Sequence, residues 1–400
     1  MNKPRLGGER QARAIRWVQY GVIALICLIG FLYAVHIAQT MGKYSVEYSP
    51  DEGNYIAMAK RLLNEHYYSY WGEGPDAYVS PGYPLFLTAC MAIFGTDLEG
   101  IFCIKVVQGL LAAATVFLTF LLGYLLTEKY SVGLIACLLH GANTVFYLYS
   151  RLLLTETLYF FTMMLFFVVF VLAMKRERWF LHVLAGVCFA VTILVRPLLI
   201  VIAPFLFLPS LVRHWKDWKT FLRPLALFAL GFLLLCLPWW VRNGVVLGEF
   251  IPLATQTNPM YAGLAPDVLA LGLTDPGSLM GNFKLLLDLL RQDFFGTIYW
   301  MTFGKFQIIF MSTQWANPQV FADFLKDVAV YLGLFGGLRA LFSKKYWGTA
   351  LVFWVYLASS FLFIPVSRYS MQYLPLLGIL AGYLLMEAFS HKHPGAKAHT

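Results

Sequence analysis

The sequence predicts an all-α polytopic membrane protein with a bundle of about ten transmembrane helices. Sixty per cent of its 400 residues are hydrophobic and only 13% are charged, whereas a soluble domain of this size has roughly 45–50% apolar and about 25% charged residues. The apolar residues form blocks of about 15–24 residues, long enough to cross a hydrocarbon core of about 30 Å. Aromatic pairs such as Trp239-Trp240 lie at block edges, where amphipathic rings suit the headgroup level.

Ten apolar blocks predict spans, and we expect the first to be retained rather than cleaved as a signal peptide. The stretch from Pro81 to Phe94 is shorter, about 14 residues, and stretches of this length are more often interfacial than spanning. We therefore expect interfacial helices in the first outer loop. The predicted spans cover residues 17–37, 103–126, 131–149, 155–174, 179–195, 197–212, 223–241, 327–342, 347–364 and 370–389.

Basic residues between the spans predict the orientation. The N-terminus carries five basic residues against one acid, so it is expected to be cytoplasmic. With ten spans, the basic segments 175–178, 213–219 and 344–345 and the C-terminal tail lie on that same side. A crossing at 81–94 would move all of these to the outside. The net charge of +9 therefore reflects membrane orientation, and no compact basic domain suggests a nucleic-acid partner.

Three parts follow from this topology. Residues 1–241 form a transmembrane module with a first outer loop at 38–102, residues 242–326 form a second outer region, and residues 327–400 hold the last helices and a cytoplasmic tail. The six cysteines are single and lack CxxC spacing, so neither a disulfide framework nor a cysteine metal site is indicated.

An acidic pair, Asp51-Glu52, lies in the first outer loop before a predicted amphipathic helix. Ser49 and Glu52 have the spacing of a capping box, with Pro50 at the first helical position. Capping alone explains the acids, because carboxylates stabilise a helix N-terminus. A carboxylate at a helix start is also well positioned for catalysis, so both interpretations stay open.

Isolated arginines form the second group, at the predicted outer ends of spans. Such arginines often extend to lipid headgroups, but guanidinium groups also bind phosphate bidentately. Glu156, one turn from the first of them, either pairs with it or contacts a polar ligand. The four arginines are Arg151, Arg196, Arg242 and Arg368.

These motifs resemble GT-C fold glycosyltransferases, in particular the superfamily of protein O-mannosyltransferases and lipid A aminoarabinose transferases, including its bacterial branch. The resemblance covers residues 15–215 and, beyond them, the final pair of spans. In place of the basic or histidine residue and double proline of many relatives, this chain has Ser80-Pro81-Gly82-Tyr83-Pro84. The matching segments are Pro50 to Tyr55, Ser80 to Leu85, Arg151 to Glu156, Ala185-Gly186 to Arg196-Pro197, and Arg368-Tyr369 followed by Leu374-Pro375.

The resemblance implies a polyprenyl-phosphate-linked sugar donor and a glycan, lipid or protein acceptor. Asp51 would be the general base, and Glu52 would help to place the acceptor or a divalent metal. Arg151, Arg196 and Arg368 would bind the donor phosphate, and Glu156 and Tyr55 would contact sugar or acceptor. No cofactor is firmly implied beyond that possible metal. A lipid-linked glycan flippase and a non-catalytic membrane scaffold remain as alternatives, although charges gathered at one face favour the enzyme.

Overall fold

The computed structural model describes residues 5–42, 50–311 and 320–392, and within these ranges every regular element is a helix. The predicted all-α class is therefore confirmed. In chain order the helices are α1 (Arg5–Gly42), α2 (Pro50–Asn64), α3 (Gly82–Phe94), α4 (Leu98–Thr127), α5 (Tyr130–Gly141), α6 (Thr144–Tyr149), α7 (Thr155–Arg176), α8 (Trp179–Val195), η1 (Pro197–Ile202), α9 (Ala203–Leu206), α10 (Leu208–Arg213), η2 (Trp215–Asp217), α11 (Lys219–Val246), α12 (Asn258–Tyr261), α13 (Leu279–Gln292), α14 (Phe294–Tyr299), η3 (Trp300–Gly304), η4 (Gln307–Met311), α15 (Val320–Leu341), α16 (Trp347–Ser360), η5 (Ser367–Gln372) and α17 (Leu374–Lys392).

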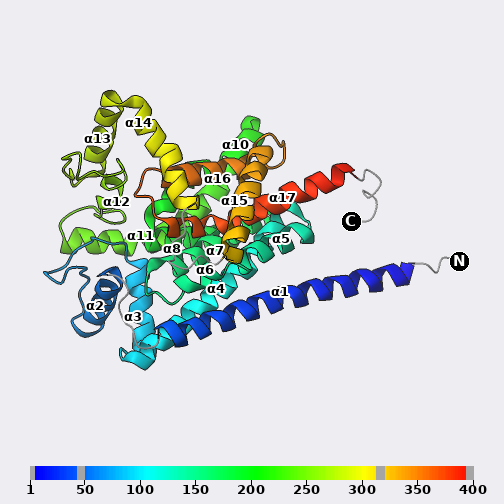
Figure 1. Cartoon of the computed structure of the whole chain (residues 1–400), viewed down its shortest axis with the longest axis horizontal. Helices are drawn as coiled ribbons and strands as arrows, with labels where there is room; N and C mark the ends of the chain where they lie inside the picture. The colour runs from blue at the N-terminus through cyan, green and yellow to red at the C-terminus, as the bar shows by residue number, and fades with distance from the viewer. Residues whose placement is uncertain (1–4, 43–49, 312–319, 393–400) are drawn as a thin grey trace.

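Four helices in the described ranges are long and apolar enough to cross a membrane: α1 over Trp17–Thr40, α4, α7 and α11. Shorter apolar helices, including α5, α8 and part of α17, pack between them to complete a polytopic bundle. Figure 1 shows α3 running across the direction of α1 rather than along it. This orientation agrees with the interfacial helix expected at 81–94.

Two predicted spans are not continuous helices. The span expected at 131–149 divides into α5 and α6, because Asn143 begins a new helix by accepting a hydrogen bond from the Phe146 amide at 3.3 Å. The span expected at 197–212 is a series of short segments, η1, α9 and α10. Each of these has a proline at its first or second position, and proline favours a helix start over a helix interior.

Glycines allow close contact between neighbouring helices. A Cβ atom on Gly186 of α8 would lie 2.0 Å from the Phe228 carbonyl oxygen of α11, and one on Gly231 of α11 would lie 2.0 Å from the Val183 oxygen. Gly333 of α15 approaches Leu377 of α17 in the same way. Small residues at such crossings let backbones approach closely, as is typical of membrane helices.

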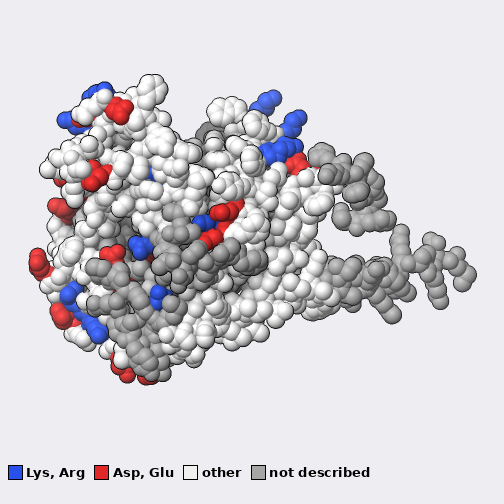
Figure 2. Space-filling model, viewed as in Figure 1, with Lys and Arg blue, Asp and Glu red and all other residues white. Residues whose placement is uncertain are grey.

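The bundle has two different ends. The helices α2 and α12 lie at one end, and the start of α1 and the end of α17 point to the other (Figure 1). Figure 2 shows charged side chains around α2, α12 and α13 at the first end and near α10 and α16 toward the second, with a small further group near the middle of the view between these two ends. We call these the α2 end and the terminal end.

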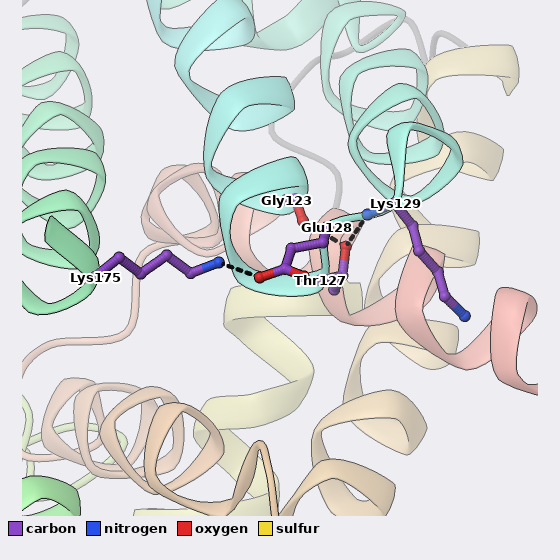
Figure 3. Close-up of polar contacts among 5 residues, drawn as sticks. All are labelled: Gly123, Thr127, Glu128, Lys129 and Lys175. Carbon is purple, nitrogen blue, oxygen red and sulfur yellow. Dashed lines mark hydrogen bonds and ion pairs between the residues drawn. The ribbon is translucent and has the colours of Figure 1, made fainter. Parts of the chain in front are cut away.

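The terminal end collects the basic segments that were expected on one side. There α4 ends at Thr127, and the next residue, Glu128, has a φ of +63°. Glu128 forms an ion pair with Lys175 at the end of α7, with 2.7 Å between Glu128 Oε1 and Lys175 Nζ (Figure 3). Lys345 acts electrostatically on the same carboxylate. Gly348 of α16 packs on Pro209 of α10, so all three internal basic segments meet far from Asp51.

Candidate active site

The acidic pair lies at the start of α2, as the sequence indicates, but its two carboxylates point to different environments. The Asp51 side chain is exposed, and its Oδ1 atom accepts a hydrogen bond at 3.0 Å from the Tyr70 hydroxyl. Burial and the neighbouring Asp51 carboxylate raise the pKa of Tyr70 to about 12. Tyr70 therefore stays protonated at neutral pH and orients Asp51 as a donor. The Ser49 half of the predicted capping box lies outside the described residues.

Glu52 is fully buried. Its Oε1 atom accepts a hydrogen bond at 2.7 Å from the Leu153 amide, across about a hundred residues of sequence. Lys105, also buried, interacts electrostatically with Glu52 and Arg151. A buried carboxylate is tolerated when charges and hydrogen bonds compensate it, so this group fastens α2 to the turn before α7.

The turn at residues 150–154 is held by a second buried side chain. Gln108 donates from Nε2 to the carbonyl oxygens of Ser150 and Leu152, both at 2.8 Å, and accepts from the Tyr83 hydroxyl at 3.1 Å. Because Glu52 also binds the Leu153 amide, buried side chains hold three backbone positions of this turn: Ser150, Leu152 and Leu153. Glu156, in the first turn of α7, is placed by this turn.

Glu156 binds two arginines that are far apart in the sequence. Its Oε1 atom lies 3.3 Å from Arg196 Nη1 and 3.4 Å from Arg368 Nε, and its side chain is only 6% exposed. The Arg196 guanidinium also lies 4.6 Å from the centre of the Tyr369 ring, within cation–π range. Two positive charges and one negative charge leave a net positive group, which we call the Glu156 triad.

Arg196 reaches the triad because α8 ends there. The residue has an extended backbone and is followed by Pro197, and the residue before a proline disfavours the helical region. Gly82, at the start of α3, packs against this end, since a Cβ on it would lie 2.6 Å from the Val195 nitrogen. The Ser80-Pro81-Gly82 motif is thus explained by contact with the helix that carries Arg196.

Arg368 lies in η5, and the loop before it is fastened by the segment that precedes α15. Lys305 is fully buried and donates from Nζ to the carbonyl oxygens of Phe361, at 2.5 Å, and Phe363, at 3.1 Å. The Ile364 amide donates to the Pro259 oxygen at 2.7 Å. Lys305 stands between the π-helical segments η3 and η4, a geometry frequent at functional sites.

Tyr55 connects the two charged groups. Its ring packs edge-on against Tyr70 at 5.9 Å and Tyr83 at 5.1 Å between centroids. Burial raises the pKa of Tyr55, and Tyr70 and Glu156 add to the rise, while Arg196 opposes it. Asp51 makes a further, smaller contribution. Tyr55 is therefore within electrostatic reach of both Asp51 and the Glu156 triad.

The loop between α2 and α3 is rigidly folded around Asp76. Its carboxylate accepts from the Tyr70 and Tyr78 amides at 2.7 and 3.1 Å and from the Ser69 hydroxyl at 3.1 Å. Arg242 of α11 donates to the carbonyl oxygens of Asp76 and Tyr68, at 2.7 and 3.0 Å. Arg242 is thus a brace for the loop.

The predicted site residues fall into two sets. The structure brings Asp51, Tyr55 and the Glu156 triad to the α2 end, while Glu52 and Arg151 belong to the buried anchor beside Lys105. Sequence reasoning missed Tyr70, Gln108, Asp76 and Lys305. A polar residue inside an apolar block is the signal that singles out Gln108 and Lys305.

The two acids of the pair are not placed as shared ligands of one metal, because the Asp51 carboxylate is exposed and the Glu52 carboxylate is buried. Glu52 has its carboxylate bound to the Leu153 amide and close to Lys105, so it is not paired with Asp51. In the part of the chain that the structure describes, no three His, Cys, Asp or Glu side chains gather as a metal site would require.

Residues 78–241 match the family described as dolichyl-phosphate-mannose-protein mannosyltransferase. No curated protein matches the sequence. Among solved structures, the chain is similar to ArnT from Cupriavidus metallidurans bound to undecaprenyl phosphate, with a TM-score of 0.54 and 16% identity over 96% of this chain and 63% of that one. It is also similar to the archaeal oligosaccharyltransferase AglB from Archaeoglobus fulgidus, in complex with an inhibitory peptide and a dolichol-phosphate, with a TM-score of 0.57 and 13% identity over 94% of this chain and 51% of that one. The chain thus spans less than two thirds of either protein.

Proposed function

Because the chain has the GT-C fold of these membrane glycosyltransferases, we propose that it moves a sugar from a polyprenyl-phosphate-linked donor to an acceptor hydroxyl at the outer face of the membrane. One observation carries the proposal. The exposed carboxylate of Asp51 and the guanidinium group of Arg196 both act on Tyr55, and Arg196 shares the buried Glu156 carboxylate with Arg368.

The donor phosphate suits the Glu156 triad. Charge-assisted hydrogen bonds are about 2.7–2.9 Å long, whereas the two arginine contacts to Glu156 are 3.3 and 3.4 Å. Each guanidinium group has five N–H donors, so both can bind a phosphate as well as Glu156. The solved structures similar to this chain contain undecaprenyl phosphate and dolichol-phosphate, and a lipid carrier of the same chemistry is the donor we propose here.

Asp51 acts as the general base. Its carboxylate takes the proton of the acceptor hydroxyl, and the acceptor oxygen forms a bond to the anomeric carbon of the sugar. The bond from that carbon to the phosphate oxygen breaks, and the electron pair leaves with the polyprenyl phosphate. Arg196 and Arg368 stabilise the negative charge that grows on the phosphate, and the Tyr70 hydroxyl keeps Asp51 within reach of the acceptor.

The two ends of the bundle support the assignment to the outer face. The basic segments that orient membrane proteins toward the cytoplasm meet at the terminal end, beside Glu128 and Lys175. Asp51 begins α2, which lies at the other end (Figure 1), and Glu156 and Arg196 act on Tyr55 of the same helix. The proposed reaction therefore takes place where lipid-linked sugars and their acceptors meet outside the cell.

The test incubates the purified protein with a panel of polyprenyl-phosphate sugars and follows donor consumption and product. Asp51→Asn should reduce transfer by about 10²–10⁴-fold, the usual contribution of a general base, while the protein still folds. The matched control is Glu249→Gln, which changes an exposed acid outside the site. Undiminished transfer by Asp51→Asn would remove Asp51 from the mechanism. Failure of every donor would refute the proposed reaction.

A further inference from the structure

Three aromatic rings in mutual contact adjoin Asp51. Tyr70, whose hydroxyl donates to Asp51, packs against Trp71 with 5.0 Å between ring centroids and against Tyr78 with 5.1 Å. Trp71 and Tyr78 also lie 5.1 Å apart. Trp71 is 59% exposed and Tyr78 is partly exposed. We call these three rings the aromatic platform.

The platform is held in place before any ligand arrives. Asp76 binds the backbone amides of both Tyr70 and Tyr78, and Arg242 binds the Asp76 carbonyl. An exposed tryptophan on such a fixed loop loses little conformational freedom on binding. Neither the phosphate chemistry of the Glu156 triad nor the general base requires Trp71 or Tyr78, so the exposure of these two rings points to a second ligand.

Polar groups from a separate segment border the platform. The Tyr78 hydroxyl lies 3.5 Å from Asn258 Oδ1, and the Gln256 side chain also hydrogen-bonds to it. The backbone amide of Gln256 donates to the backbone carbonyl of Tyr78 at 3.1 Å. This hydrogen bond fixes the segment that carries Gln256 and Asn258 to the platform. Aromatic faces bordered by a few fixed amides and a carboxylate match a sugar ring, which has apolar C–H faces and hydroxyl groups at its edge.

The charged side chains that act on Tyr78 are acidic, and the nearby Arg61 guanidinium, beside Gly72, already donates to the Ser69 carbonyl. Burial raises the pKa of Tyr78, and the carboxylates of Asp51 and Asp275 raise it further. Glu73, near Trp71 in the sequence, is exposed. A phosphate or carboxylate over the rings would be repelled by these acids, and the anionic headgroups of a membrane surface would be repelled in the same way.

We propose that the aromatic platform of Tyr70, Trp71 and Tyr78 is the acceptor subsite, and that the acceptor is a neutral glycan. A sugar ring stacks on Trp71 and Tyr78, its edge hydroxyls bond to Asn258 and Gln256, and one hydroxyl reaches Asp51. This inference rests on the proposed function for the transfer step, but the binding itself requires no donor.

The test measures binding of free saccharides by saturation-transfer-difference NMR, with the full chain in nanodiscs. The probes are maltotriose, cellotriose and mannotriose, with 3′-sialyllactose as an anionic trisaccharide and a threonine-rich heptapeptide as a protein-like acceptor. We expect magnetic saturation to pass from the protein to the C–H protons of at least one neutral trisaccharide. Trp71→Ala should weaken its binding at least about fivefold, and Trp71→Tyr should restore most of it.

Two control variants show whether the loss of binding is specific to the platform. Trp215→Ala and Trp179→Ala remove two other exposed tryptophans, 71% and 60% exposed, outside the platform; both variants should bind the saccharide normally. The inference is overturned if no neutral trisaccharide binds, if Trp71→Ala binds normally, or if only the heptapeptide depends on Trp71. Saccharide binding without consumption of any donor would instead refute the proposed reaction and leave the subsite intact.

Discussion

Replacing Glu156 with glutamine tests the central charge arrangement directly. The change preserves side-chain shape but removes the negative charge that lies 3.3 Å from Arg196 and 3.4 Å from Arg368. Because Glu156 is almost fully buried, its loss leaves two cations without their shared counter-ion. Breaking a buried ion pair costs about 3–5 kcal/mol, so the ligand-free protein should unfold at a clearly lower temperature.

A phosphate should compensate for this loss. Farnesyl phosphate, a short polyprenyl phosphate, would place its own negative charge between the two arginines. It should therefore raise the unfolding temperature of Glu156→Gln by more than it raises that of the wild type. The measurement is thermal unfolding followed by fluorescence in detergent, with and without farnesyl phosphate.

The matched control lies at the terminal end. Glu128→Gln removes a carboxylate that also forms an ion pair, with Lys175 at 2.7 Å, but this carboxylate is 70% exposed (Figure 3). Exposed pairs contribute little to stability, so this variant should unfold like the wild type and respond normally to the ligand. Equal stability of Glu156→Gln and the wild type, or an equal response to farnesyl phosphate, would refute the phosphate-binding role of the Glu156 triad.

Three further predictions concern the supports of the site. Gly82→Ala places a methyl group 2.6 Å from the Val195 nitrogen, beside Arg196. It should cost about 1–3 kcal/mol of stability and lower kcat. The control Gly244→Ala meets nothing within 4 Å and should leave kcat unchanged. Lys305→Met leaves the Phe361 and Phe363 carbonyls without the ammonium group that binds them, which should cost about 1–3 kcal/mol of stability each and raise the donor KM. An unchanged donor KM would show that the loop before η5 does not depend on Lys305. Tyr70→Phe removes the hydroxyl that donates to Asp51, a hydrogen bond worth about 0.5–1.5 kcal/mol; kcat should therefore fall by about two- to tenfold, and an unchanged kcat would contradict the role of Tyr70 in orienting Asp51.

The helices could be predicted from the sequence because apolar blocks long enough to span a membrane have few other structures available to them. Helix ends inside an apolar block were harder to predict. The end of α5 and start of α6, for example, depend on the helix cap that Asn143 forms within an otherwise apolar run. Counting the spans predicted that Arg196 and Arg368 lie at the same end of the bundle. Their common partner, Glu156, did not, because the sequence offered Arg151 as a nearer choice.

Residue roles that depend on tertiary contacts were not predictable. Glu52 has the pattern of a helix cap, yet its carboxylate binds the Leu153 amide of a distant turn. Arg242 has the pattern of a membrane-boundary arginine, yet it binds two loop carbonyls. In both cases the local sequence explains the residue type, and only the packed structure shows the partner.

The aromatic platform and the Glu156 triad differ in the kind of backbone that carries them. The triad is built from the ends of packed elements, α7, α8 and η5, fixed by glycine contacts and buried hydrogen bonds. Trp71 and Tyr78 lie on a connecting loop, where substitutions disturb little of the core. If these two rings form the proposed acceptor subsite, acceptor choice can drift during evolution while the carrier lipid stays the same, and exchanging Trp71 and Tyr78, while keeping the buried Tyr70 that holds Asp51, is a direct route to redirecting the enzyme toward a new glycan.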